Sequence, residues 1–305
     1  MGETEAGTTS GLVWPAKQRE IVKWVIDSRP WNDFAMRDDD IVITTWAKSG
    51  TTWMQQIVGQ LIFSGEPDLY GEERSPWIEF RLRDGDVARA AEQTHRRYLK
   101  SHLAIDALVY SPSAKYISLG RDIRDTYWSW HNHHMSLNEG VLAFISSLYP
   151  DQPPATYPDP DTRTAFFNWL ENDAHPNWSF WDYSQGWFDA GELPNLKMVH
   201  FADLLADLPG QIRQIAAFLE IEIDPKTWPD MLEHCSFDYM RRLGVAREGM
   251  RKIFKEGGAS FFHKGTNGRW RDVLSDDDNA RVHAIVAEHL TPECAHWLTT
   301  GHLPQ

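Results

Sequence analysis

Ile41-Val-Ile-Thr-Thr-Trp-Ala-Lys-Ser-Gly-Thr-Thr-Trp53 is the stretch of the chain that decides the fold. Its β-branched first five residues, Ile41–Thr45, predict a buried strand. Apolar side chains then recur at helical spacing, at Trp53, Ile57, Leu61 and Ile62. The short polar loop between these two patterns should therefore join a strand to the N-terminus of a helix.

A loop of this kind is suited to binding an anion, because backbone N–H groups and the helix dipole both favour negative charge. Lys48 adds a positive charge, and the hydroxyls of Ser49, Thr51 and Thr52 can donate hydrogen bonds. We expect a phosphate or sulfate group here. The loop is not a nucleotide P-loop, because Lys48 precedes Gly50 whereas that motif places lysine after its second glycine. The alternative is that the hydroxyls only cap the helix, which would leave Lys48 unexplained.

Composition limits the classes of partner. The chain has 305 residues, 42% hydrophobic and 24% charged, and we interpret residues 1–305 as one domain whose first 12 residues are disordered. A formal charge of −14 argues against nucleic-acid binding, so an anionic ligand needs a local group of basic residues. No apolar run is long enough to span a bilayer, and Cys235 and Cys294 form no disulfide framework or metal motif. The expectation is a cytoplasmic protein.

Further strands and helices alternate along the chain. We predict strands at 97–101, 115–119 and 196–201 and helices at 15–28, 88–97, 122–135, 164–189 (broken near Pro176), 209–220, 228–242 and 276–290. Residues 137–162, which are rich in proline, and 244–268 are predicted to be mobile loops. The alternation predicts an α/β fold with a central, mostly parallel sheet flanked by helices. Ligands of such sheets bind at the carboxyl ends of the strands.

His102 lies just beyond the strand predicted at 97–101, where its imidazole could face the loop that contains Lys48. Histidine is the side chain best matched to accepting a proton near neutral pH. The chain has 13 histidines, so an ordinary surface or core histidine remains the alternative for this residue taken alone.

Arg121 stands at the end of another predicted strand, and Ser129 follows eight residues later. If a helix starts near Asp122, Ser129 lies about 10 Å along its axis. Arg121 and Ser129 could then bind one phosphate together. The alternative is a capping salt bridge from Arg121 or Arg124 to Asp125.

A fourth stretch, Phe261-Phe-His-Lys-Gly-Thr-Asn-Gly-Arg-Trp-Arg271, places Lys264 before two nearby glycines. Such a backbone is flexible enough to close around an anion, with Trp270 as its anchor. As an isolated pattern it is weak.

Together the four stretches resemble the cytosolic sulfotransferase family, which uses 3′-phosphoadenosine 5′-phosphosulfate (PAPS) as sulfate donor. The family's loop is intact at Lys48–Trp53, and its Lys-[Ser/Thr]-His element matches Lys100–His102. Its Arg-Asp…Ser element matches Arg121 and Ser129, and its Lys-Gly-x-x-Gly-x-Trp clasp matches Lys264–Trp270. The resemblance extends in order from about residue 35 to residue 275.

The resemblance implies that Lys48–Thr52 bind the 5′-phosphosulfate, including Ser49, Gly50, Thr51 and Thr52, and that Trp53 stacks on adenine. The 3′-phosphate would be bound by Arg121, Ser129, Lys264 and Gly265. Ser236 and Phe237 match an adenine-contacting pair more loosely. His102 would take the proton of the acceptor, Lys48 would stabilise the leaving group, and Lys100 completes the catalytic set. The acceptor would be the hydroxyl of a small molecule, and no metal is implied.

The chain departs from the family pattern at three places. The arginine before the clasp lysine is replaced by His263, so a phosphate contact would be weaker or come from another basic residue: Arg247, Arg251, Lys252 or Lys255. The tyrosine that often follows the strand at 196–199 is replaced by His200-Phe201. The C-terminal dimerisation motif of animal members is not visible, so the oligomeric state stays open.

Alternatives stay open for the chemical class of the acceptor and for the reaction. Aromatic residues suggest a phenol, steroid-like or other apolar alcohol, although core packing explains them equally well: Trp77, Phe80, Trp128, Tyr149 and Tyr157. The histidines of His131–His134 diverge around a helix, which favours an exposed or pocket-lining cluster over a metal site. The alternative functions are those of an ATP-dependent phosphotransferase and of a catalytically silent nucleotide-binding protein.

Overall fold

Four parallel strands form the central sheet of the computed structural model, which describes residues 13–83, 85–151 and 153–303. The strand order is β2-β1-β3-β4, with bounds β1 Ile41–Thr45, β2 Tyr98–Ser101, β3 Lys115–Gly120 and β4 Leu196–His200. All three neighbouring pairs are parallel. The predicted α/β class and the four predicted strands are therefore confirmed, whereas the predicted disorder of residues 1–12 lies outside the described residues.

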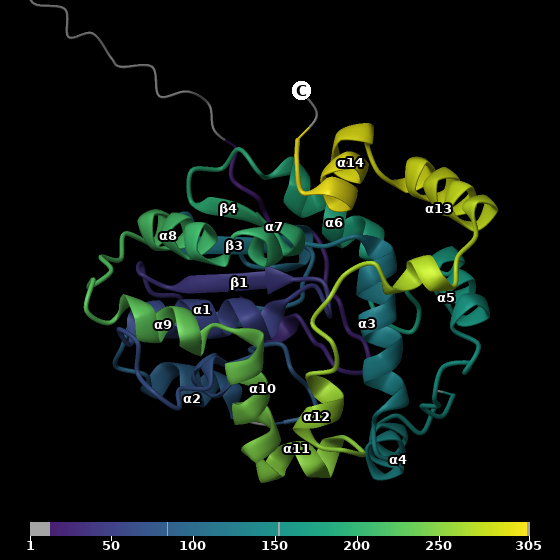
Figure 1. Cartoon of the computed structure of the whole chain (residues 1–305), viewed down its shortest axis with the longest axis horizontal. Helices are drawn as coiled ribbons and strands as arrows, with labels where there is room; N and C mark the ends of the chain where they lie inside the picture. The colour runs from purple at the N-terminus through teal and green to yellow at the C-terminus, as the bar shows by residue number, and fades with distance from the viewer. Residues whose placement is uncertain (1–12, 84, 152, 304–305) are drawn as a thin grey trace, which may run out of the picture.

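The strand order creates a crevice between β1 and β3. The chain leaves β1 through helix α1 (Thr51–Ile62) and reaches β2 on one side. It leaves β3 through helix α3 (Ile123–Met135) and eventually reaches β4 on the other side. Because connections leave these adjacent strands in opposite directions, a ligand site opens at their carboxyl ends. In Figure 1 the β1 arrow points toward α3.

Helices cover both faces of the sheet, so the strands alternate between two hydrophobic cores. Ile41 and Ile43 pack on one side with α1, α8 (Leu208–Leu219) and α9 (Trp228–His234). Val42 packs on the other side, in a core rich in tryptophan that includes α6 (Phe180–Asp189). The remaining helices are α2 Asp86–Glu92, α4 Glu139–Leu148, α5 Thr162–Glu171, α7 Phe201–Ala206, α10 Phe237–Ala246, α11 Glu248–Ile253, α12 Gly258–Phe261, α13 Asp276–His289 and α14 Pro292–Thr300. No helix in the described residues is long and apolar enough to cross a membrane.

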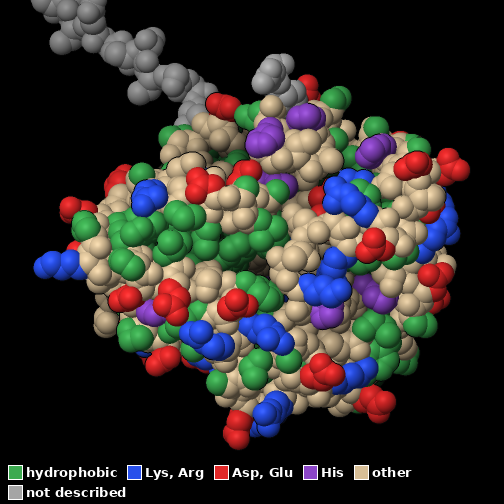
Figure 2. All heavy atoms as spheres, in the orientation of Figure 1, with side chains coloured by type: hydrophobic (Ala, Val, Ile, Leu, Met, Phe, Trp, Pro, Cys, Tyr) green, Lys and Arg blue, Asp and Glu red, His purple; other side chains and the backbone are tan. Residues whose placement is uncertain are grey.

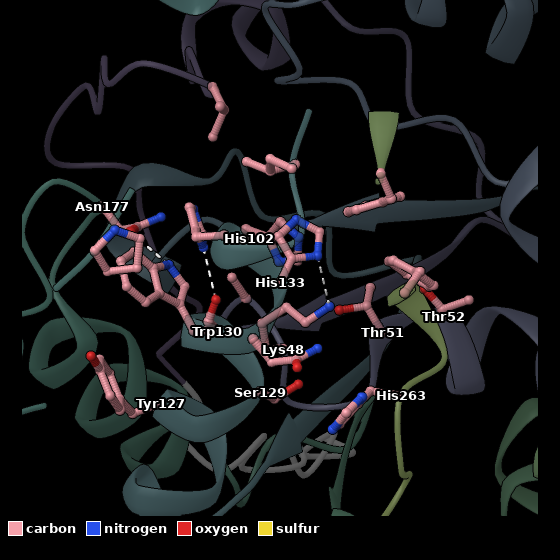
Figure 3. Close-up of a pocket in the computed structure, with 18 of the residues that line it drawn as sticks. Lys48, Thr51, Thr52, His102, Tyr127, Ser129, Trp130, His133, Asn177 and His263 are labelled. Atoms are coloured by element: carbon pink, nitrogen blue, oxygen red, sulfur yellow. Dashed lines mark hydrogen bonds between the residues drawn. The ribbon is translucent and has the colours of Figure 1, made fainter. Parts of the chain in front are cut away.

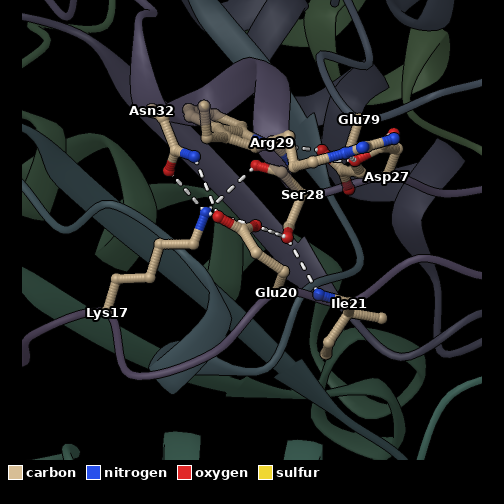
Figure 4. Close-up of polar contacts among 9 residues, drawn as sticks. Lys17, Glu20, Ile21, Asp27, Ser28, Arg29, Asn32 and Glu79 are labelled. Atoms are coloured by element: carbon tan, nitrogen blue, oxygen red, sulfur yellow. Dashed lines mark hydrogen bonds and ion pairs between the residues drawn. The ribbon is translucent and has the colours of Figure 1, made fainter.

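The prediction of a helix at residues 15–28 is wrong. The segment instead forms a loop that is closed by polar contacts (Figure 4), in which Ile21 N donates to Ser28 Oγ at 2.9 Å and Lys17 pairs with Glu20 at 2.8 Å. The backbone of Asp27 bonds outward, to the carbonyl of Glu79 at 2.8 Å. These tertiary contacts satisfy the backbone in place of helical hydrogen bonds and override local propensity.

Two predicted loops contain helices. Residues 137–162 include α4, whose Leu142 and Ile145 are buried one turn apart, and Thr162, the first residue of α5. The described residues between these two helices belong to no helix or strand. Residues 244–268 include the end of α10, α11 and α12. All five prolines of the first segment follow α4, so they end that helix rather than prevent it. The mobility of both segments stays a prediction.

Other boundaries shift. The helix predicted at 228–242 is two helices, α9 and α10, separated by Cys235 and Ser236. The break near Pro176 is confirmed and separates α5 from α6. The chain continues beyond the last predicted helix into α14, which begins at Pro292, because proline is favoured in the first turn of a helix.

Candidate active site

The loop between β1 and α1 has a backbone that few residues tolerate. Gly50 is the N-cap of α1 with φ +114°, and a Cβ there would lie 2.8 Å from the ring of Phe201. Lys48 also has positive φ, at 70°. The N-cap receives no side-chain hydrogen bond, so the alternative in which Ser49, Thr51 or Thr52 caps this helix is wrong. Thr51 instead shares a 2.5 Å hydrogen bond with Thr45.

A cavity of about 720 Å³ lies at the strand ends and brings together most of the predicted site residues (Figure 3). It is lined by Lys48, Gly50, Thr51, Thr52, Trp53, Lys100, His102, Arg121, Ser129, Phe237, His263, Lys264 and Gly265. Ser49 is buried and faces a separate small cavity beside Tyr183 and Trp297. Ser236 caps α10 by accepting a hydrogen bond from Tyr239 N at 3.2 Å. Their placement gives no side-chain contact with the main cavity.

His102 has the geometry of a base. Its Nδ1 lies 2.7 Å from the carbonyl oxygen of Thr45, so Nδ1 carries the proton and donates it there. Nε2 is therefore the basic nitrogen of this cavity-lining ring. Burial, with the nearby Lys100 ammonium, holds the pKa of His102 well below its usual value. The imidazole is consequently neutral at physiological pH and able to accept a proton.

Glu79, which the sequence analysis did not single out, holds the chain around His102. This buried carboxylate accepts three hydrogen bonds, from His102 N at 2.6 Å, Trp77 Nε1 at 2.7 Å and Trp31 Nε1 at 2.8 Å. The ring of Trp77 packs edge-on against His102, with centroids 4.9 Å apart. Lys100 Nζ lies 3.8 Å from the centre of the Trp77 ring.

We expect Glu79→Gln to lower the free energy of unfolding by about 1–3 kcal/mol, because one amide N–H must then face a donor in a buried site. Urea denaturation measures this change. Turnover should fall as well, since the same carboxylate fixes the backbone of His102. Unchanged stability together with unchanged turnover would show that the three hydrogen bonds to Glu79 do not fix the position of His102.

Lys48 extends into the cavity in an unusual setting. Its Nζ lies 3.2 Å from Nδ1 of His133, a residue of α3, and 4.5 Å from the centre of the Phe261 ring. Burial lowers the pKa of Lys48 to about 7, and the positive charges of Lys100 and Arg121 act in the same direction.

Arg121 connects the loop Lys48–Thr52, named the cradle from here on, to the clasp Lys264–Trp270. Its guanidinium donates to the carbonyl oxygens of Lys48 at 2.9 Å and Thr266 at 3.2 Å, and to Asn267 Oδ1 at 2.9 Å. It also lies 4.0 Å from the ring centre of Phe201. Burial lowers the pKa of Arg121 to about 10, so the guanidinium stays charged.

The alternative capping salt bridge is wrong. Arg124 pairs with Asp122 at 2.6 Å, and Asp125 accepts from the backbone N–H of Gly268 at 2.6 Å. Gly265 has φ +64°, and a Cβ there would lie 2.6 Å from the ring of Phe237. The clasp thus needs glycine at this position.

Arg269 is a second residue, after Glu79, that the sequence analysis did not single out. It lines the cavity next to His263, and burial lowers the pKa of its guanidinium. None of the four proposed substitutes for the family arginine lines the cavity: Arg247 pairs with Glu73 at 2.7 Å, Lys255 donates to the carbonyl of Met135 at 2.8 Å, and Arg251 and Lys252 are exposed on α11. The sequence feature that could have identified Arg269 is its position inside the clasp, directly before Trp270.

The aromatic residues expected around the acceptor divide into two groups. Trp77, Phe80 and Tyr157 line the cavity. Trp128 packs in the core against Phe166, which is the alternative expected for these residues, and Tyr149 donates a hydrogen bond to the carbonyl of Trp24. Neither Trp128 nor Tyr149 lines the cavity. On the face of the molecule shown in Figure 2, acidic and basic side chains are interspersed.

The three histidines of His131–His134 have separate partners. His131 Nε2 lies 2.8 Å from the carbonyl of Asp159, His133 contacts Lys48, and His134 Nδ1 lies 2.9 Å from the carbonyl of Trp130. Within residues 13–83, 85–151 and 153–303, no three His, Cys, Asp or Glu residues are grouped as metal ligands would be.

A parallel sheet with a lysine-containing strand-to-helix loop at its switch point, and a buried histidine lining the same cavity, is the arrangement of an α/β enzyme site. The family model described as the sulfotransferase domain matches residues 38–292, so the chain belongs to the sulfotransferase domain family and is a sulfotransferase. PAPS dependence is a property that this family membership implies.

Individual relatives agree with this placement. The chain is 28% identical to glycolipid sulfotransferase of Mycobacterium tuberculosis (strain ATCC 25177 / H37Ra), covering 90% of this chain and 92% of that protein. It is 27% identical to sulfotransferase 2A2 of Mus musculus, over 86% and 87% of the two chains. The crystal structure of mouse sulfotransferase SULT7A1 complexed with PAP superposes with a TM-score of 0.65 at 19% identity, covering 88% of this chain and 90% of that one. The similarity to the mouse structure shows the fold alone.

Proposed function

We propose that the protein transfers the sulfuryl group of PAPS to the hydroxyl of an apolar or aromatic small molecule. One observation carries the proposal: the cradle, the base and the clasp converge on one cavity at the switch point of the sheet. Six lysine and arginine side chains line this cavity, in a chain whose net charge is −14: Lys23, Lys48, Lys100, Arg121, Lys264 and Arg269. They supply the local positive charge that an anionic donor requires.

In this proposal the cradle binds the 5′-phosphosulfate and Trp53 stacks on adenine. Arg121, Ser129 and the backbone at Lys264 and Gly265 bind the 3′-phosphate. Trp53 is held by its Nε1, which donates to the carbonyl oxygen of Cys235 at 2.8 Å. We assign no donor contact to Ser49 or Ser236, because neither lines the cavity.

The proposed reaction is an in-line transfer. The acceptor oxygen attacks sulfur while its proton passes to Nε2 of His102. The bond between sulfur and the bridging oxygen breaks, and its electron pair stays on that oxygen, where the Lys48 ammonium stabilises the charge. PAP, the donor without its sulfuryl group, then leaves. Sulfuryl transfer, like phosphoryl transfer, depends on positioning and charge stabilisation more than on covalent catalysis.

Calorimetry tests the donor. We expect PAP to bind much more tightly than adenosine 5′-monophosphate, which lacks only the 3′-phosphate, and more tightly than ATP. ATP binding as tight as that of PAP would favour the phosphotransferase alternative. Absence of nucleotide binding would overturn the proposed donor site.

We expect Arg121→Ala to weaken PAP binding by about 10- to 100-fold, as the loss of hydrogen bonds to a charged group predicts. Adenosine 5′-monophosphate, measured by the same calorimetry, should lose much less, and acceptor affinity should change little. Arg121→Lys is the matched control, because it keeps the charge but not the planar fork. Equal losses for both nucleotides would mean that Arg121 only ties the cradle to the clasp.

A second acceptor class is the hydroxyl of a glycolipid, as the name of the mycobacterial relative, glycolipid sulfotransferase, suggests. One part of the cavity has amides beside indole rings, a surface that suits a sugar: Asn168, Asn172, Asn177, Trp130 and Trp169. Another part is apolar, with Val141, Leu142, Ile145 and Ile253. A head group with a hydrocarbon tail would match both parts.

An acceptor screen with labelled PAPS separates these classes. It compares a phenol, a long-chain alcohol, an alkyl glycoside with the same chain, and the free sugar. Preference for the phenol or alcohol supports an apolar acceptor, whereas preference for the alkyl glycoside supports a glycolipid. We also propose a reducing, cytoplasmic location, with which the two buried free thiols Cys235 and Cys294 are compatible.

A further inference from the structure

The contact between Lys48 and His133 is not part of the reaction described above. Within the described residues, the Lys48 ammonium has one hydrogen-bond partner, Nδ1 of His133 at 3.2 Å, and Figure 3 shows this pair between Thr51 and His102. Apart from this bond it lies against the aromatic ring of Phe261. A flexible four-carbon side chain is thus held at its end by a single imidazole.

His133 is itself held rigidly by its surroundings. Its ring packs against Phe254 and Phe261, with centroids 5.0 and 5.9 Å away, and against His134 at 5.3 Å. On α3 it lies four residues after Ser129, so both side chains project from the same helical face. Burial and the Lys48 charge hold the pKa of His133 well below its usual value, so a neutral Nδ1 can accept from the ammonium.

A neutral acceptor suits this position better than a carboxylate. The charged groups that act on Lys48 are Lys100, Arg121 and Arg269, which disfavour its protonation, and Glu72, which favours it. A carboxylate in place of His133 would form an ion pair and cancel the charge that the leaving group needs. A neutral imidazole orients the ammonium and leaves its charge available.

We propose that His133 is a positioning residue that accepts a hydrogen bond from Lys48 and aims its ammonium at the bridging oxygen of the donor. The inference rests on the proposed function for the role of that ammonium. The hydrogen bond and its effect on Lys48 can be measured without turnover.

The test compares His133→Phe, which keeps a ring and loses the acceptor atom, with His133→Asn, whose Oδ1 can replace Nδ1. Competitive labelling with acetic anhydride, read by mass spectrometry of the Lys48 peptide, gives the pKa of this amine in each protein. Loss of the acceptor disfavours the charged form. The wild-type pKa of about 7 should therefore fall by about one unit in the Phe variant and stay near the wild-type value in the Asn variant.

Kinetics give a second readout. The kcat/KM for PAPS should decline with rising pH as Lys48 loses its proton, and this decline should begin about one pH unit lower in the Phe variant, with rescue by Asn. His134→Phe is the control for labelling, because His134 bonds to the carbonyl of Trp130 and not to Lys48. If the Phe variant does not fold, His133→Gln, whose polar end reaches the Nε2 position, replaces it in the comparison with Asn.

An unchanged pKa of Lys48 in the Phe variant, or equal shifts in the Phe and Asn variants, would overturn the inference. Failure of the proposed function has a different signature. The wild-type protein would then neither bind PAP nor use PAPS, whatever the labelling of Lys48 shows.

Discussion

His102→Ala lowers kcat by at least about 100-fold, the range expected when a general base is removed. Affinity for PAP should stay nearly unchanged, because His102 faces the acceptor and not the nucleotide in the proposed complex. Steady-state kinetics with saturating PAPS measure the first effect, and calorimetry with PAP measures the second.

The pH profile distinguishes a base from a structural histidine. Burial and Lys100 lower the pKa of His102, so its neutral form persists well below the ordinary pKa of histidine. The wild-type kcat should therefore show no acidic decline near pH 6.5, the approximate pKa of free histidine. His102→Gln is the matched control, because it keeps a polar side chain that is not basic. Near-normal turnover in either variant would exclude His102 as the base.

Lys48→Met lowers kcat by about 100- to 1,000-fold, comparable with the removal of a preorganised group that stabilises developing charge. Methionine keeps an unbranched apolar side chain one heavy atom shorter than lysine, so the substitution removes the ammonium together with its contact to the Phe261 ring. Lys48→Arg should recover only part of the activity, since the larger guanidinium does not fit the same contact with His133.

For Lys48→Met, the fall in kcat must be compared with the change in affinity for PAP. A fall in kcat that exceeds the loss of PAP affinity assigns Lys48 to the transition state. An equal loss in PAP affinity and in kcat/KM, with kcat unchanged, would make Lys48 only a phosphate-binding residue.

The sheet and the cradle were predictable because their information is local. The β-branched run Ile41–Thr45, the glycine-containing loop and the apolar spacing of α1 lie within 22 consecutive residues, and the observed β1 and α1 have the predicted positions. The convergence of Lys48, His102 and Arg121 follows from a parallel sheet, since each residue follows a strand that ends at the same edge.

The parts that were missed depend on contacts between distant segments. Segment 15–28 has helical composition but bonds to residues near Glu79, and this pairing is not visible in its own pattern. Glu79 lies in a polar connection, and only the fold places its carboxylate beneath His102. His133 was considered with its neighbours as a metal site, although its partner is an amine 85 residues away.

One measurement tests the central claim most directly: incubation of the protein with sulfur-labelled PAPS and an alkyl glycoside, long-chain alcohol or phenol. The account predicts label in an organic sulfate ester and PAP in equal amount, with both lost in His102→Ala and Lys48→Met. Label that stays in PAPS with every acceptor, or appears only as inorganic sulfate at a rate unchanged in these two variants, would contradict it.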